Sequence, residues 1–85
     1  MDGTTEFVIS PNPTRGRFTI EQKGDARYSI ICTDIFGMQG NRVISSHHPG
    51  YRKWDCNLES NPAGLYYIRI NTDGKMTILK VVVTR

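Results

Sequence analysis

The chain has 85 residues, of which 38% are hydrophobic and 22% charged, and its formal net charge is +3. A chain of this length builds one domain with a modest core, which excludes a two-domain enzyme with an interdomain cleft. Its basic residues are scattered, whereas a nucleic-acid-binding protein is expected to cluster them among aromatic residues, so we expect no nucleic-acid partner.

The first five residues have neither a basic segment nor an apolar core, so they do not resemble a signal peptide. We interpret residues 1–5 as a linker or a remnant, residues 6–85 as the domain, and the chain as an excised piece of a longer protein. No apolar stretch approaches the roughly 18 residues of a membrane helix. We therefore expect a module that does not span a bilayer.

Short β-branched and aromatic runs alternate with turn residues along the rest of the chain, and no apolar period of 3.6 residues persists over the length of a helix. The pattern predicts strands over residues 7–10, 17–22, 27–34, 41–47, 52–58, 65–71 and 76–84. Turn signals recur at intervals of roughly 8–12 residues. They favour an all-β, seven-stranded, immunoglobulin-like antiparallel sandwich, with a small barrel as the alternative.

The connection between the first two predicted strands contains Pro11, Asn12 and Pro13, followed by Gly16. The two prolines fix φ and push Asn12 toward extended geometry. Gly16 can adopt the positive φ that returns the chain to the next strand. The segment is therefore expected to be a rigid turn.

Three later turns are predicted by their composition. Asp34 with Gly37 predicts a turn after the third strand, and residues 61–64, Asn-Pro-Ala-Gly, predict another before the sixth. Asp73-Gly74 is the strongest hairpin signal, because both central residues of a type I′ turn need a positive φ. We therefore expect the last two strands to pair antiparallel.

Alternation within the strands predicts the side chains that face the core, because successive side chains point to opposite faces of a sheet. The predicted core contains Phe18, Ile20, Ile30, Trp54, Leu58, Tyr66, Ile68 and one face of residues 81–83. The same alternation turns both cysteines, Cys32 and Cys56, inward. The sequence leaves open whether they form a disulfide or remain two buried thiols.

The sequence lacks the spacings of catalytic and metal-binding motifs. His47 and His48 are adjacent, so in a strand they point to opposite faces and cannot share a metal. Zinc, phosphate-loop and serine-hydrolase patterns are missing. We therefore predict no catalytic residue, no cofactor and no metal. Exposed aromatics at Phe36, Tyr51 and Tyr67 leave sugar stacking open, although cross-strand packing is the favoured interpretation.

Motifs in a fixed order carry a resemblance to a known family. Pro11-Asn12-Pro13 followed by Gly16 resembles the P-N-P-x-x-G opening of type IX secretion C-terminal sorting domains, known from Bacteroidetes. Residues 31–37, which contain Asp34 and end at Gly37, resemble an apolar strand of that family ending in D-x-x-G.

The second half of the chain continues the resemblance. Leu58 followed by Pro62, Gly64 and Tyr66 is similar to the family's L-x(n)-P-x-G-x-Y box. Residues 80–85 resemble its basic, valine-rich last strand. Each motif alone is weak, but their order and spacing across residues 7–85 are specific to the family.

The resemblance implies an immunoglobulin-like domain joined by a linker to an N-terminal cargo domain. It implies that the cargo crosses the periplasm, meets the type IX translocon and its shuttle proteins, and reaches the outer-membrane surface or the extracellular space. A sortase-like cysteine protease would then remove the domain, and anionic lipopolysaccharide would be joined to many cargoes. No enzymatic activity of the domain itself is implied.

The resemblance also implies where the sorting surface lies. The residues expected to form it belong to the last two strands and are Gly64, Tyr66, Lys80, Val81, Val82, Val83 and Arg85. We expect a receptor to read the edge or terminus of the last strand, with strand addition as one mode. The alternative function is that of an accessory carbohydrate-binding or adhesive sandwich.

Overall fold

The computed structural model describes residues 7–24, 27–49 and 52–84, which form strands and no helix. The strands are β1 (Phe7–Ser10), β2 (Arg17–Gln22), β3 (Ile30–Phe36), β4 (Arg42–Pro49), β5 (Lys53–Asn57), β6 (Gly64–Thr72) and β7 (Lys75–Val83). Over these ranges, no helix is available that is long and apolar enough to cross a membrane. The all-β class predicted from the sequence is confirmed.

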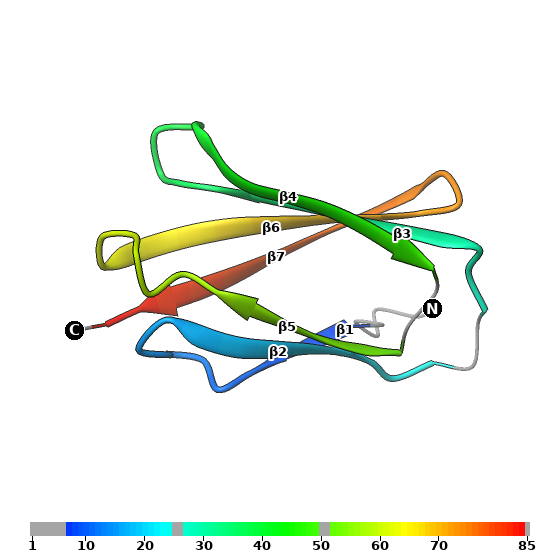
Figure 1. Cartoon of the computed structure of the whole chain (residues 1–85), viewed down its shortest axis with the longest axis horizontal. Coiled ribbons are helices and arrows are strands. Elements are labelled where there is room, and N and C mark those ends of the chain that lie inside the picture. The colour runs from blue at the N-terminus through cyan, green and yellow to red at the C-terminus, as the bar shows by residue number, and fades with distance from the viewer. Residues whose placement is uncertain (1–6, 25–26, 50–51, 85) are drawn as a thin grey trace.

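Two antiparallel sheets lie face to face, as Figure 1 shows. One sheet has the strand order β1-β2-β5 and the other has the order β4-β3-β6-β7. The chain therefore changes sheets after β2, after β4 and after β5. This division of seven strands between two layers is that of an immunoglobulin-like sandwich.

The core fills the space between the sheets. Its buried hydrophobic residues are Phe7, Phe18, Ile20, Ile31, Ile35, Leu58, Tyr66, Ile68, Ile70, Val81 and Val83. Trp54 is only partly buried and meets Phe7 edge-on, with 5.9 Å between ring centroids. The alternation predicted for residues 81–83 is confirmed, because Val82 remains 39% exposed between its two buried neighbours.

β3 differs from the predicted third strand in both position and face. Asp34, predicted to end the strand and begin the turn, lies within the strand, which runs on to Phe36. Ile31 and Ile35 fill the core, whereas Ile30, predicted to be buried, is 54% exposed. The consecutive isoleucines offer an apolar side chain to either face, so local alternation could not choose between them. Ile35 lies between Asp34 and Gly37, in the predicted turn, and its burial in the core decides the face.

The change of face also corrects the prediction for Cys32, whereas Cys56 packs against the core as predicted. Cys32 lies on the outer side of the four-stranded sheet, whereas Cys56 packs partly buried from the other sheet, and both are free. The disulfide left open by the sequence is therefore not formed. Burial, with the neighbouring Asp55 carboxylate, raises the pKa of the Cys56 thiol to about 11. At neutral pH this thiol is therefore protonated.

The last two strands form the hairpin that the sequence predicts. Asp73 has φ 48° and Gly74 has φ 96°, as a type I′ turn requires. The hairpin register continues without interruption from Thr72 opposite Lys75 to Gly64 opposite Val83.

Candidate functional site

The motif turns gather at the end of the sandwich that carries the C-terminus. Figure 1 shows the β1–β2, β3–β4 and β5–β6 connections at this end, opposite the β6–β7 turn. Within the hairpin, Gly64 pairs with Val83 and Tyr66 with Val81. The fold therefore brings the P-x-G-x-Y box against the last strand.

An arm formed by residues 11–14 crosses to β7, on the side away from β6. The side-chain amide of Asn12 donates to the Lys80 carbonyl at 3.0 Å and accepts from the Val82 amide at 3.0 Å. Thr14 continues the pairing, because its amide donates to the Val82 carbonyl at 2.9 Å and its carbonyl accepts from the Thr84 amide at 2.7 Å. The arm thus acts as a short extra strand, in which the Asn12 side chain supplies the donor and the acceptor that a backbone amide and carbonyl would otherwise supply.

This pairing closes part of an exposed sheet edge. β7 is the last strand of its sheet, so alternate residues direct their backbone groups away from β6. The contacts with the arm show that Lys80, Val82 and Thr84 are among these residues. While the arm is in place, no other strand can pair with the backbone of Val82.

Gly16 anchors the arm to the chain ahead of β6. Its carbonyl accepts from the Leu58 amide at 2.7 Å, and its φ is 140°. A Cβ atom on Gly16 would lie 2.9 Å from the Cα of Glu59. Glycine is therefore required here both by the backbone conformation and by the close approach of a second segment.

Tyr66 shapes the turn before β6 from within the core. Its ring is only 5% exposed, and its hydroxyl donates to the carbonyl of Pro62 at 2.5 Å. A buried tyrosine that bonds back to the backbone a few residues upstream is the tyrosine corner of immunoglobulin-like sandwiches. Gly64 has φ 147° with open space around it, so backbone conformation alone requires glycine there.

The predicted sorting residues fall into two groups. Tyr66, Val81 and Val83 are buried and support the hairpin from inside. Lys80 and Val82 are exposed, and Gly64 is half-buried. Arg85 lies outside the described residues, as do Tyr51 and residues 1–5.

Exposed apolar side chains line the outer face of β7. Met76 is 53% exposed, Ile78 61% and Val82 39%, with exposed Lys80 on the same face. We did not predict Met76 and Ile78 as surface residues of interest. The signal was present in the sequence, because apolar residues at every second position oppose the side of the strand that fills the core.

Asp34 of β3 is the centre of a cluster of charged and polar side chains on the outer face of the four-stranded sheet. Asp34 accepts from the Ser45 hydroxyl at 2.7 Å and from Arg69 at 3.1 Å, and Arg42 lies 4.0 Å away. The Ser45 hydrogen bond, together with Arg69 and Arg42, holds the pKa of Asp34 below its usual value despite partial burial. Asp34 is therefore a structural carboxylate of the sheet rather than a turn residue.

The aromatic residues of this face have partners within the protein. Phe36 and Tyr67 are neighbours across β3 and β6, and the Arg69 guanidinium lies 5.0 Å from the centre of the Phe36 ring. Arg69 therefore occupies the ring face that a sugar would need. The contact with Arg69 supports the interpretation of Phe36 as part of cross-strand packing.

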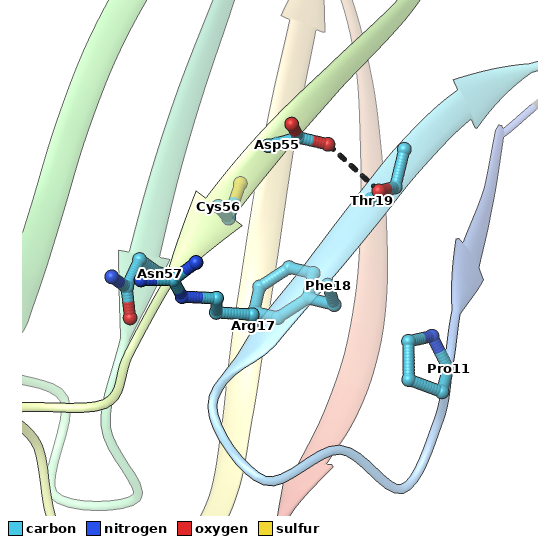
Figure 2. Close-up of a pocket in the computed structure, with 7 residues that line it drawn as sticks. All are labelled: Pro11, Arg17, Phe18, Thr19, Asp55, Cys56 and Asn57. Atoms are coloured by element: carbon cyan, nitrogen blue, oxygen red, sulfur yellow. Dashed lines mark hydrogen bonds between the residues drawn. The ribbon is translucent and has the colours of Figure 1, made fainter.

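The outer face of the three-stranded sheet is polar. A hollow of about 420 Å³ lies against β2 and β5. On its wall the Thr19 hydroxyl donates to Asp55 at 2.8 Å, the bond drawn as a dashed line in Figure 2. Arg17, also on its wall, forms an ion pair with Glu59 at 3.0 Å. Among the described residues, no group of three or more His, Cys, Asp or Glu side chains could hold a metal.

Comparison with known protein families gives a match to the family described as Secretion system C-terminal sorting domain, over residues 8–84. The matched region runs from β1 through β7 and includes the arm and the turns described above. Among curated proteins, none matches the chain.

Proposed function

The chain belongs to the type IX secretion C-terminal sorting domain family, and from that premise we propose that it directs an attached N-terminal cargo through the outer-membrane translocon to the cell surface. Shuttle proteins would deliver the cargo from the periplasm. A sortase-like cysteine protease would then remove the domain, with release of the cargo or its attachment to anionic lipopolysaccharide.

The observation that supports this proposal is the junction between the arm and β7. Asn12 and Thr14, from the opening motif, bond to Lys80, Val82 and Thr84, from the last strand. Motifs about 70 residues apart thus form one folded unit at the C-terminal end of the domain. We propose that the translocon recognises this unit as a shape, with the outer face of the β6–β7 hairpin as its accessible surface.

The proposal assigns different roles to the predicted residues. Tyr66, Val81 and Val83 hold the hairpin in place, because their side chains are buried. Lys80 and Val82 are available for direct contact, because they are exposed. Substitutions in the first group should impair export through loss of the fold, and those in the second group without loss of the fold.

Export of a reporter protein fused ahead of the chain tests this function. In a bacterium with a type IX system, the wild-type fusion should reach the surface, and deletion of residues 80–85 should leave it in the periplasm. The deletion also removes core residues and can therefore unfold the domain. A double variant, Lys80→Glu with Val82→Asp, changes exposed side chains only and tests whether the surface itself is needed for export. Lys53→Glu, on the outer face of the other sheet, is the control. Surface delivery of the deleted fusion at the wild-type level would refute the proposal.

A further inference from the structure

The arm covers only one half of the β7 edge. Met76 and Ile78 have the same backbone orientation as Lys80 and Val82, because the register of β7 with β6 has no shift. Their amides and carbonyls, and the amide of Lys80, make no hydrogen bond with any described residue on the outer side of the strand. None of the described residues therefore pairs with the edge from Met76 to the Lys80 amide, directly next to the stretch that the arm closes.

The side chains beside this open edge have a definite chemistry. Met76 and Ile78 are both more than half exposed, and Lys80 follows them at the same spacing. No ion pair joins Lys80 to any described residue, whereas Arg42 and Arg69 on the same face share the carboxylate of Asp34. The outer face is thus apolar at the open edge and carries an excess of positive charge.

We propose, as an extension of the sorting function, that an extended segment of a partner protein adds as a strand beside Met76, Ile78 and Lys80. The segment carries two apolar side chains and one carboxylate at every second position, so that all three lie on one face of the added strand. Backbone groups of the segment satisfy the open edge, since strand addition supplies hydrogen bonds at regular spacing. Its apolar side chains lie beside Met76 and Ile78, and its carboxylate lies beside Lys80.

The charge of the surface favours this occupant over two others. A second copy of the chain would bring the same positive outer face and would be repelled. An anionic lipid surface would match the charge but could not supply alternating donors and acceptors along the strand edge. An acidic, extended peptide segment satisfies both requirements.

Nuclear magnetic resonance of the 15N-labelled 85-residue chain tests the inference with two synthetic seven-residue peptides. Both have threonine at the odd positions and valine at positions 4 and 6, and one has glutamate at position 2 where the other has lysine, so the valines and the charged residue share one face of the strand. The glutamate peptide should shift the amide signals of Met76, Ile78 and Lys80 saturably, with a dissociation constant at least tenfold lower than that of the lysine peptide. Lys80→Glu should reverse this preference.

Two variants separate the strand edge from its side chains. Ile78→Pro removes an amide that points away from β6, so the hairpin ladder is retained while binding should fall at least tenfold. Ile78→Ala keeps the amide and should retain most of the binding. Ile30→Ala is the control for loss of a side chain elsewhere on the sheet, because Ile30 on β3 is 54% exposed against 61% for Ile78.

Several results would overturn the inference. These are no shift with either peptide, equal affinity for both peptides, wild-type binding by Ile78→Pro, or shifts confined to β4. Shifts at the same amides that depend only on protein concentration would identify a second copy as the occupant. Shifts with anionic phospholipid vesicles but with neither peptide would identify a lipid. If the wild-type fusion is exported while these tests fail, only this inference is lost; if that fusion is not exported, the sorting function itself is wrong.

Discussion

The two halves of β7 lie in different surroundings. From the Lys80 carbonyl to the Thr84 amide the outward backbone is bonded to Asn12 and Thr14, and the inward side chains of Val81 and Val83 are buried. In residues 75–79 the outer side chains are more exposed, and the backbone at Met76 and Ile78 has no partner among the described residues. One strand therefore contains a segment that secures the fold and a segment that is free to contact a partner.

This difference separates the residues that define the family from those that a partner can reach. The opening motif, the P-x-G-x-Y box and the valine-rich strand mainly position the chain, through Asn12, Gly16 and Tyr66. Met76 and Ile78, which belong to none of the motifs, are the most exposed apolar side chains of the hairpin. A sequence motif can thus mark the residues that hold the fold of a signal domain rather than those that a partner contacts.

The largest difference between the halves should appear in core stability. Val81→Ala deletes two fully buried methyl groups and is expected to lower the free energy of unfolding by about 2–3 kcal/mol. Ile78→Ala removes a side chain that is 61% exposed and should change it by less than about 0.5 kcal/mol. Urea denaturation followed by tryptophan fluorescence measures both. Equal losses for the two variants would contradict the division of β7.

Removal of the Asn12 side-chain amide should lower the free energy of unfolding by less. Asn12→Ala breaks the bonds to Lys80 and Val82 and is expected to cost about 1 kcal/mol, because both bonds are near the surface. Gln39→Ala, which removes an exposed amide in the β3–β4 turn, is the matched control and should be neutral. The same denaturation experiment distinguishes them, and an Asn12→Ala variant as stable as the control would show that the arm does not hold β7.

Amide hydrogen exchange compares the halves residue by residue. The amides of Val82 and Thr84 should exchange at least roughly tenfold more slowly than those of Met76 and Ile78, because only the first pair has partners on the outer side. Asn12→Ala should accelerate Val82 and leave Thr84 protected, since Thr84 bonds to the Thr14 carbonyl. Uniform exchange along the outward amides of β7 would show that the arm is not bound.

The smallest effect concerns the charges beside the hairpin. Because the pKa of Asp34 is lower in the folded protein than in the unfolded chain, its ionised form stabilises the fold above about pH 4 and this contribution is lost as the pH falls through the folded pKa. Asp34→Asn should therefore be less stable than the wild type by up to about 1 kcal/mol near pH 7 and equal to it near pH 2. Thermal unfolding over this range measures the difference, and a gap that widens in acid would refute the assignment.

Most of the fold could be predicted from the sequence because its signals are local. Alternation and turn chemistry place six of the strands within one or two residues, including the hairpin at Asp73-Gly74. The prediction for β3 was wrong because the consecutive isoleucines suit either face. Which of them faces the core depends on Ile35 and on packing between the sheets. Periodicity cannot resolve such a strand without its tertiary neighbours.

The candidate site was predictable only in part, for a related reason. The pairing of the P-x-G-x-Y box with the last strand follows from the hairpin register and was expected. The bonds of Asn12 to Lys80 and Val82 join residues about 70 positions apart, and nothing in the turn sequence indicates which sheet edge the arm reaches. The open part of the edge could be identified only once the closed part was known.

The central claim is that the sorting signal is a folded hairpin surface rather than a linear C-terminal sequence. Ile68→Asp places a charge in the core and should unfold the domain while leaving residues 75–85 unchanged. Circular dichroism of the 85-residue chain checks the unfolding, and export of the reporter fusion, assayed by surface protease accessibility, gives the answer. We predict that the Ile68→Asp fusion remains in the periplasm while Lys53→Glu is exported as the wild type is. Surface delivery of the unfolded Ile68→Asp fusion at the wild-type level would contradict the claim.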